Sequence, residues 1–403
     1  MHPHHIGVGF ASTVLSLLVS SHRAYGQCQY EFIPYYSASP SDTSITLWSI
    51  SETGWLGGWL NTLYGNPIVI TPDGTLVQLP GGQFGHGRVH GVTNDGIAVG
   101  VAQLDPGSTY AKPVRWIDGV LIPLPSPEPF LTGNVYDTNN SGTVVGSLYG
   151  WPSLNGVAIW QDGVLTHFLT DEISCLEAIA DDGTAVGRGK PQPDSLLRAL
   201  VWRDGVVEWL ALPEGMTSSF AGSVSQSGLV AGHVQASLSA APQATVWTDG
   251  LPLLLPMQPG YTRSNANGIN SLGQIVGRCQ PPGLGPLSDL TMLWQHGVGY
   301  PLFSLLVSPF AGTILSAADI NERGEIAGYG RDANGIYCGM VLRPVRTRAG
   351  DVTIDCRVDA LDISALLEFW GKQYGYDGGP GDLDGDREVG PLDLAVLLGD
   401  WAP

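Results

Sequence analysis

Two stretches near the C-terminus have the residue types and the spacing of a calcium-binding loop. They read DVTIDCRVDALD from Asp351 and DLDGDREVGPLD from Asp382. Calcium binds about six to eight oxygen atoms, and a loop of about 12 residues supplies them from positions 1, 3, 5, 7, 9 and 12, with a backbone carbonyl at position 7. The ligands expected on this spacing are Asp351, Thr353, Asp355, the Arg357 carbonyl, Asp359 and Asp362 in the first loop, and Asp382, Asp384, Asp386, the Glu388 carbonyl and Asp393 in the second. Gly390 leaves position 9 of the second loop to water, so the sequence predicts two calcium sites.

Both loops belong to a duplicated segment, because Asp351 and Trp370 recur 31 residues later as Asp382 and Trp401. Each loop runs into an apolar stretch, Ile363 to Trp370 or Leu394 to Trp401, for which we expect a helix. Residues 350–403 contain twelve acids and three bases, a net charge of −9. A solvated acidic tail would account for that charge but not for the repeated spacing.

The segment resembles the type I dockerin module, which has two calcium loops, each followed by a helix. Aspartate at position 12 fits this resemblance, whereas Cys356 and Arg387 replace the turn glycine at position 6, and Thr353 is a weak ligand. The resemblance implies a cohesin-like partner that contacts positions 10 and 11 of each loop. Those positions are Ala360 and Leu361 in the first loop, and Pro391 and Leu392 in the second.

The rest of the chain is organised by a ten-residue phrase that occurs seven times, most clearly as DINERGEIAG from Asp319 to Gly328. The turn glycines of the seven copies are Gly54, Gly96, Gly142, Gly183, Gly228, Gly273 and Gly324. Their separations of 41 to 51 residues are typical of propellers and solenoids. Each phrase predicts a β-hairpin, since a glycine that can adopt positive φ stands between two extended runs.

A second phrase follows most copies and ends in a tryptophan and a tight turn, as in PVRWIDG from Pro113. Asp-Gly is the residue pair that two-residue type I′ turns favour, so each repeat should contain two hairpins and four strands. The repeated tryptophans are Trp116, Trp160, Trp202, Trp247 and Trp294. Because they recur at one place in each repeat, we expect them to fill the space between neighbouring sheets rather than to bind a sugar.

The first and last repeats are incomplete in complementary ways. An extended segment, Tyr30 to Tyr35, precedes the first repeat, and the last repeat ends at Pro344 without a returning strand. We therefore expect an all-β, seven-bladed β-propeller over residues 27–346, in which the N-terminal strand completes the last blade and removes the open sheet edges. The first and last repeats carry Ile70 and Arg343 where the others carry tryptophan. An open stack of the same repeats is the alternative, and it would need polar caps.

The paired phrases resemble the HAF family, a probable extracellular repeat of exported bacterial proteins. Several copies lack the asparagine of the HAF phrase, as at Thr93, Ala180 and Ser225. The resemblance implies an extracellular setting and brings no defined activity.

The expected order of the strands indicates which face of the propeller should bind a ligand, because it decides on which face each connection lies. Two kinds of connection on this face vary: those between the second and third strands of a blade, and those from the fourth strand to the next blade, one of which should carry His86, Arg88 and His90. The variable segments include residues 103–110, 149–155, 190–195, 280–288 and 331–335. Variable loops on a rigid scaffold are where binding usually resides. Candidate contacts on this face are His86, Arg88, His90, Tyr149 and Trp151, although solvated loop residues would look the same.

The net charge and the distribution of apolar residues exclude some classes of function. A net charge of −19 argues against nucleic-acid binding, and an apolar run from Ile6 to Val19 suggests that residues 1–26 are a secretory signal peptide. No later stretch is long and apolar enough to cross a bilayer. The resulting domains are 1–26, the propeller at 27–346, a linker at 347–349 and the dockerin-like module at 350–403. The chain contains five cysteines, and their pairing cannot be read from the sequence.

Two functions remain open at this stage. One is a secreted, non-catalytic protein whose propeller binds a polysaccharide or a surface protein while the calcium-dependent module docks. The other is a carbohydrate-active hydrolase or lyase carried by the module. No nucleophile, zinc or phosphate-loop motif occurs. Asp105, Asp194, Asp289 and Asp332 lie in suitable loops, and a glycosidase would need two facing carboxylates.

Overall fold

The computed structural model describes residues 29–38, 44–62, 65–82, 85–105, 110–128, 130–150, 154–169, 173–192, 195–237, 239–283, 288–308, 311–345, 348–353, 357–373 and 381–401. The chain forms two compact units, Gln29–Val345 and a second one that contains the described residues from 348 onward. The expected signal peptide lies outside the described residues.

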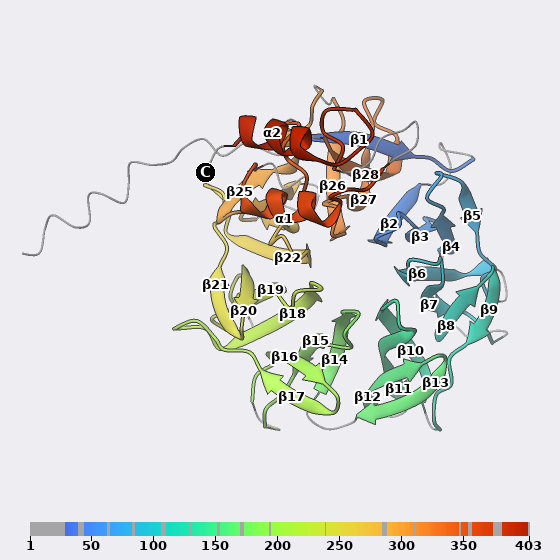
Figure 1. Cartoon of the computed structure of the whole chain (residues 1–403). Helices are drawn as coiled ribbons and strands as arrows, with labels where there is room; N and C mark the ends of the chain where they lie inside the picture. The colour runs from blue at the N-terminus through green and yellow to red at the C-terminus, as the bar shows by residue number, and fades with distance from the viewer. Residues whose placement is uncertain are drawn as a thin grey trace, which may run out of the picture. The chain divides into compact units, whose positions relative to one another are not determined.

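The first unit is a ring of seven four-stranded antiparallel sheets, so the predicted seven-bladed β-propeller is confirmed (Figure 1). The blades are formed, in chain order, by β2 (Ile45–Ile50), β3 (Leu56–Leu60), β4 (Asn66–Ile70) and β5 (Leu76–Gln78); β6 (Gly87–Val92), β7 (Ala98–Ala102), β8 (Lys112–Ile117) and β9 (Val120–Pro123); β10 (Phe130–Thr138), β11 (Thr143–Gly150), β12 (Leu154–Gln161) and β13 (Val164–Leu169); β14 (Ile173–Ile179), β15 (Ala185–Gly189), β16 (Arg198–Arg203) and β17 (Val206–Trp209); β18 (Ser218–Val224), β19 (Val230–Gln235), β20 (Gln243–Thr248) and β21 (Leu251–Leu254); β22 (Arg263–Ile269), β23 (Ile275–Gln280), β24 (Leu290–Gln295) and β25 (Val298–Pro301); and β26 (Thr313–Ile320), β27 (Ile326–Arg331) and β28 (Tyr337–Val345). The first strand of each blade lies innermost, and a short 3-10 helix, η3 (Leu302–Leu305), links the last two blades.

The ring is closed by the strand at the start of the unit, β1 (Gln29–Tyr35). It pairs antiparallel with β28, so that Phe32 lies opposite Leu342 and Ile33 opposite Val341. The last blade therefore has the order β1-β28-β27-β26 and contains both ends of the unit. Because this pairing covers the edge of β28, the open stack is excluded.

One register prediction was wrong. In five blades, the residue two positions after the turn glycine pairs with the tryptophan, as Ala98 pairs with Trp116. In the first blade the equivalent pair is Leu56 and Ile70. In the last blade, Ile326 pairs with Leu342, so Leu342 and not Arg343 occupies that place. A shift of one residue turns a strand side chain to the other face of the sheet, which explains why Leu342 is fully buried while Arg343 is exposed.

The repeated tryptophans pack between blades, as predicted. Trp247, in the fifth blade, belongs to an apolar cluster with Val186 and Leu210 of the fourth. Its indole Nε1 donates a hydrogen bond of 2.8 Å to the Ala211 carbonyl, just after the outermost strand of that blade. Trp116, Trp160 and Trp294 donate in the same way to Pro80, Pro125 and Pro256. Each ring thus joins its own blade to the preceding one.

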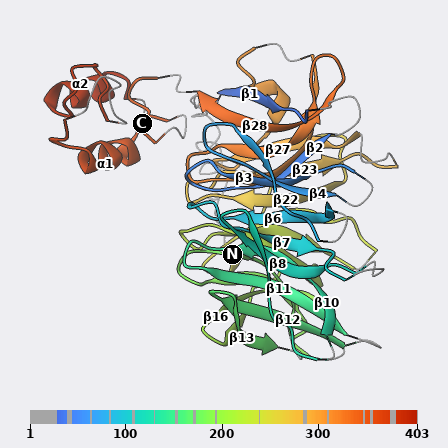
Figure 2. The ribbon, with the colours of Figure 1, turned by 90° about the vertical axis from the view of Figure 1, so that its right-hand side faces the viewer.

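The tight turns also have the predicted conformations. All seven turn glycines have positive φ, from 71° to 93°. Asp118, Asp162, Asp204, Asp249 and His296 have φ values between 49° and 53°, and a glycine with positive φ follows each of them, as a type I′ turn requires. Viewed edge-on, the strands of successive blades lie side by side (Figure 2).

A circular series of hydrogen bonds links the turns between the first and second strands of neighbouring blades. The backbone N–H two residues before the turn glycine commonly donates to the corresponding side chain of the next blade. For example, Asn94 N donates to Asn140 Oδ1 and Asn140 N to Asp181 Oδ1, both over 2.8 Å. Equivalent bonds cross the other five interfaces, including the one from Glu322 N to Glu52 that joins the last blade to the first.

The second unit contains two helices, α1 (Ala360–Glu368) and α2 (Pro391–Gly399). Both begin three residues earlier than expected, because position 12 of each loop lies in the first helical turn. The Asp359 side chain accepts the Leu361 N–H at the start of α1, and the Asp362 side chain accepts the Asp359 N–H. The core of this unit consists of Val352, Val358, Leu366, Val389 and Leu397.

In the part of the chain that the structure describes, no helix is long and apolar enough to cross a membrane. Cys175, Cys279 and Cys338 are buried free thiols. Cys28 and Cys356 lie outside the described residues.

The interblade tryptophans predict a clear stability difference. Trp247 is 1% exposed, whereas Trp48 is 47% exposed. Replacing Trp247 with alanine should lower the free energy of unfolding by about 3–5 kcal/mol, since a large buried ring leaves a cavity. Chemical denaturation of the wild type, Trp247→Ala and the matched Trp48→Ala variant measures this. Equal losses in the two variants would contradict the assigned packing role.

Candidate functional site

Every innermost strand carries a β-bulge at the same repeat position. The strand pairing skips one residue in each blade, six residues before the turn glycine. The skipped residues are Trp48, His90, Tyr136, Glu177, Gly222, Asn267 and Ala318, and all seven line the central channel. A bulge redirects a side chain out of the regular alternation. The fold therefore presents one residue per blade to the axis, and these residues differ in type although the phrase around them repeats.

The channel widens into a hollow of about 530 Å³. Its lining includes Trp48, Tyr136, Glu177, Phe220, His233 and Arg278. Phe220 lies near the start of β18 and His233 near the end of β19. The hollow therefore opens on the face that carries the variable connections, which is the face that we expect from the sequence to be functional.

A connected series of polar and aromatic groups spans one wall of this hollow. Arg188 forms an ion pair with Glu177, and its guanidinium carbon lies 3.9 Å from the centre of the Phe220 ring. Phe220 stacks on His233 at 4.8 Å, and His233 Nδ1 lies 3.0 Å from Asn265 Nδ2. Burial, helped by the charge of Arg188, lowers the pKa of His233 to about 4, so this imidazole is neutral at physiological pH and Nδ1 accepts the hydrogen bond.

A second hollow of about 380 Å³ adjoins the first, because Trp48 and Tyr329 line both. Its other walls include Trp59, Asn61, Arg88 and Tyr337. Neither Trp48 nor Tyr329 was identified from the sequence. The available signal was the repeat alignment itself, since position 48 and its six equivalents are among the most varied positions of an otherwise repetitive phrase.

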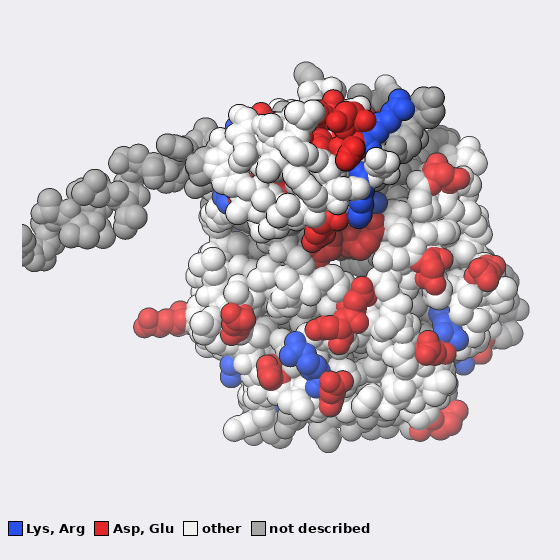
Figure 3. Space-filling model, in the orientation of Figure 1, with Lys and Arg blue, Asp and Glu red and all other residues white. Residues whose placement is uncertain are grey.

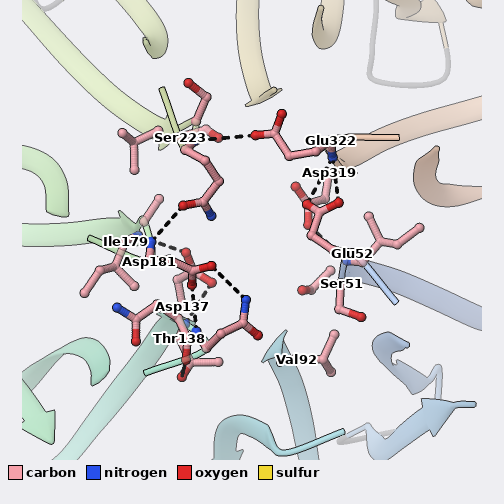
Figure 4. A pocket seen from close by; sticks show the side chains of 18 of the residues that line it. Ser51, Glu52, Val92, Asp137, Thr138, Ile179, Asp181, Ser223, Asp319 and Glu322 are labelled. Carbon is pink, nitrogen blue, oxygen red and sulfur yellow. Dashed lines mark hydrogen bonds between the residues drawn. The ribbon is translucent and has the colours of Figure 1, made fainter. Parts of the chain in front are cut away.

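The opposite mouth of the channel is acidic. Figure 4 looks into it, and Figure 3 shows acidic side chains near the centre of this face. The carboxylates that line it are Glu52, Asp137, Asp181, Asp319 and Glu322. Each of them accepts a backbone N–H from a neighbouring blade, so their role is to link blades.

Burial in this mouth raises the pKa of Asp137 to about 7 and that of Asp319 to about 6. Asp137 accepts hydrogen bonds from Ile179 N and Thr138 N, and these oppose the shift. The folded protein therefore retains protons on these carboxyl groups at pH values where the unfolded chain releases them.

The loop residues proposed from the sequence are placed differently from expectation. Arg88 and His90 lie in β6 rather than in a loop, because that strand begins at Gly87. Arg88 lines the smaller hollow, whereas His90 Nδ1 donates to the Val135 carbonyl over 2.6 Å inside the channel. His86 Nδ1 lies 2.8 Å from Gln103 Oε1. Tyr149 is in β11, with its hydroxyl 3.2 Å from that of Tyr136, and Trp151 lies outside the described residues.

The loop acids are bound by local partners. Asp105 pairs with Lys112 at 2.9 Å, Asp289 accepts from Gln280 Nε2 over 2.8 Å, and Asp332 accepts from the Tyr36 hydroxyl over 2.8 Å. None of these three lines the larger hollow, where Glu177 is the one carboxylate among the described lining residues. Asp194 lies outside the described residues.

In the second unit, three of the five ligands predicted for the second loop lie close together. Among the described residues, carboxylate oxygens of Asp382, Asp384 and Asp393 lie within 4.8 Å of one another. Asp393 is fully buried and accepts the N–H groups of Leu383 and Gly390 over 2.6 and 2.7 Å. Asp386 Oδ1 accepts the Glu388 N–H. Arg387 at position 6 has a φ of 77°, the conformation for which the missing glycine would be suited.

The first loop is organised in a similar way around Asp362. This buried carboxylate accepts hydrogen bonds from Thr353 N, Thr353 Oγ1 and Asp359 N over 2.8 to 3.0 Å. Asp351 is also buried, and Arg357 follows the undescribed part of the loop. Asp355 lies outside the described residues.

No protein-family model matches the chain, and no curated protein matches its sequence. Among solved structures, the chain is similar to the β-propeller domain of the Trilobed protease from Pyrococcus furiosus, which is described as having an open velcro topology. The TM-score is 0.52 at 8% identity, over 75% of this chain and 97% of that one. At this identity the likeness concerns the β-propeller fold alone, and β1 closes the ring in the present chain.

Weaker likenesses are found to TolB from Acinetobacter baumannii, with a TM-score of 0.39 and 9% identity over 80% of this chain. A prolyl endopeptidase gives a TM-score of 0.47 and 12% identity over 89% of this chain. The chain spans 64% and 53% of the lengths of these two proteins. The resemblances to the HAF repeat and to dockerin therefore rest on the residues quoted for them.

The raised pKa of Asp137 predicts a pH dependence of stability. Because the pKa of this carboxyl in the folded state exceeds its ordinary value near 3.8, stability should fall as the pH rises from about 4 to about 7. The Asp137→Asn variant cannot titrate and should lose this component. Unfolding midpoints from pH 4 to 8 measure it, with Asp162→Asn in an exposed turn as the control. An identical pH profile for the wild type and Asp137→Asn would contradict the assignment.

Proposed function

We propose that this protein is an exported, non-catalytic binding protein with two functional parts. The propeller binds an extracellular polysaccharide or surface protein at the hollow on its variable face. The C-terminal unit, ordered by two calcium ions, docks onto a cohesin-like partner. Export is inferred from residues 1–26 and from the two family resemblances.

One observation carries the binding role, namely that the seven bulges place six side chains of largely different type, and one glycine, around one channel. Residues that only stabilise the ring are similar from blade to blade, as the tryptophans and turn glycines are. The bulge residues range from Trp48 to Ala318 and lead into a hollow with aromatic and polar walls. Such a lining is typical of ligand-binding sites.

The carboxylates of the hollow and of the channel favour binding over glycoside hydrolysis. A glycosidase of the usual kind needs two carboxyl groups on either side of the scissile bond. Glu177 is ion-paired with Arg188, and Asp137 and Asp319 accept backbone N–H groups from neighbouring blades. These contacts occupy the acids that a hydrolytic mechanism would use.

The donors of the second loop suit calcium. They are all oxygen atoms, which a hard cation prefers, and three of them already converge. Closely packed carboxylates repel one another, so a bound cation would offset their charge. The ligands would be Asp382, Asp384, Asp386, the Glu388 carbonyl and Asp393. In the first loop Asp351, Thr353, Asp355, the Arg357 carbonyl, Asp359 and Asp362 would take the same places.

The docking role is supported by exposed apolar side chains at equivalent places of the two halves. Leu361 and Leu392, each at position 11 of its loop, are 53% and 61% exposed. Ala360 and Pro391 precede them at the exposed start of each helix. Paired exposed leucines beside a metal loop form a surface that a partner can cover only when the loop is ordered.

The binding role is tested by screening the full-length protein in calcium against arrays of glycans and extracellular proteins, with a parallel polysaccharide-digestion assay. We expect retention of a ligand without turnover, and loss of retention in a Phe220→Ala variant. Release of reducing ends by the wild type would instead favour the carbohydrate-active enzyme.

The calcium role predicts a selective response to chelation. Chelation should unfold the C-terminal unit, which is too small to fold well without metal, and leave the propeller intact. Far-ultraviolet circular dichroism and calcium titration calorimetry measure this. Asp393→Asn should abolish one of two binding events, while Asp162→Asn in a propeller turn should retain both. Helices that persist in chelator would rule out this role.

A further inference from the structure

We infer that the smaller hollow, lined by Trp48, Trp59, Asn61, Arg88, Tyr329 and Tyr337, is a subsite for a carboxylated saccharide unit. This inference rests on the proposed binding function of the same face. It goes further by naming the chemical class of the ligand and the residues that select it.

The hollow presents a fixed aromatic surface. The rings of Trp48 and Trp59 lie 5.8 Å apart and are tilted by 37°. The Trp59 indole Nε1 donates to Asn61 Oδ1 over 3.0 Å, and Asn61 Nδ2 donates to Thr46 Oγ1 and Ser44 Oγ over 2.9 Å. The orientation of Trp59 is therefore set before a ligand binds.

Trp48 remains 47% exposed although it is a large apolar residue on an innermost strand. The bulge in β2 takes it out of the sheet alternation and turns it toward the channel. Leaving this ring in water forgoes the free energy that burial would supply. A ligand with a flat C–H face, such as a pyranose ring, would cover it.

The charge of the hollow is positive, although the chain carries −19 overall. Arg88 is the charged residue among those that line it, and its guanidinium carbon lies 5.2 Å from the Trp59 ring centre. No carboxylate within ion-pairing distance of Arg88 is found in the described part of the chain, in contrast to Arg188 and Arg278. A planar guanidinium held against a ring has donors suited to a carboxylate in a bidentate arrangement.

Tyrosine hydroxyls near Arg88 could form hydrogen bonds with the hydroxyl groups of a sugar. The Tyr329 hydroxyl has no hydrogen-bond partner among the described residues and lies on the wall shared by the two hollows. On the same side, Arg331 stacks over the Tyr337 ring at 4.2 Å and donates to its hydroxyl, which fixes that ring. Stacking rings, hydroxyl partners and one unpaired guanidinium together match a sugar that bears a carboxylate. A cationic ligand is disfavoured because Arg88 would repel it.

The test is calorimetric titration of the full-length protein, in calcium, with trisaccharides of galacturonic, glucuronic and mannuronic acid. The methyl ester of each trisaccharide keeps its shape and removes its charge, so it serves as the matched ligand control. We expect one of the acids to bind at least tenfold more tightly than its ester. Arg88→Gln should abolish this preference, and Arg88→Lys should restore part of it.

The protein controls separate this subsite from general effects. Arg203→Gln makes the same change in net charge on the opposite face and should leave binding unchanged. Trp48→Ala should weaken the acid and the ester alike by roughly tenfold, because it removes stacking and not charge. Circular dichroism confirms folding of each variant.

Two results would overturn the inference while the binding function stands. One is equal affinity for the acid and its ester, and the other is affinity for an acid that is unchanged in both Arg88→Gln and Trp48→Ala. Absence of binding to any of the uronic trisaccharides would also overturn it, and retention of another ligand in the array screen would show whether the broader function survives.

Discussion

The propeller depends on a circular constraint, since each blade is completed by contacts with its neighbours and the last blade must meet the first. Three kinds of contact satisfy this constraint. The tryptophans of five blades pack against the preceding blade, the turn side chains accept N–H groups across the interfaces, and β1 pairs with β28. A four-stranded sheet on its own would expose two edges and an apolar face, so no blade is a plausible folding unit by itself.

The two faces of the ring have different roles: one links the blades, and the other carries the variable side chains. On one face, the short turns between first and second strands are stereotyped, and their acids hold neighbouring blades together. That mouth is acidic because carboxylates are good acceptors for backbone N–H groups, as Asp181 and Glu322 illustrate. The face with the variable connections does not contribute these hydrogen bonds between blades, so its side chains can vary without disrupting the ring.

The β-bulges connect the structural constraint with the proposed function. A regular strand would place its side chains alternately against the two neighbouring sheets, leaving none for the axis. The extra residue in each innermost strand breaks that alternation and points into the channel. The repeated scaffold thus provides seven positions around one axis at which the residue type can differ from blade to blade. In this way a repetitive sequence can form a hollow with a specific lining. The second unit uses duplication differently, because its two halves keep aspartate at positions 1, 5 and 12 of each loop and buried residues at equivalent core positions, as Val358 and Val389 show.

The sequence by itself determined the features that depend on local spacing. Glycines with positive φ, Asp-Gly turns, the tryptophan positions and the number of blades all follow from short-range steric rules repeated at a regular interval. The complementary ends, Tyr30 to Tyr35 and the strand ending near Pro344, were enough to predict how the ring closes. The calcium loops remain a prediction of this kind, since their donor spacing is a property of twelve consecutive residues.

Only the tertiary structure decided which side chains meet. It placed Leu342 rather than Arg343 in the tryptophan position, because strand register is set by pairing across the sheet and not by local sequence. It placed Arg88 and His90 in β6 rather than in a loop, and it showed that both helices begin within the predicted calcium loops. It also brought Trp48, Glu177 and Phe220 to one hollow from three different blades. Residues separated by 43 to 172 positions become neighbours only when the ring closes, and no local pattern records the bulge that turns two of them toward the axis.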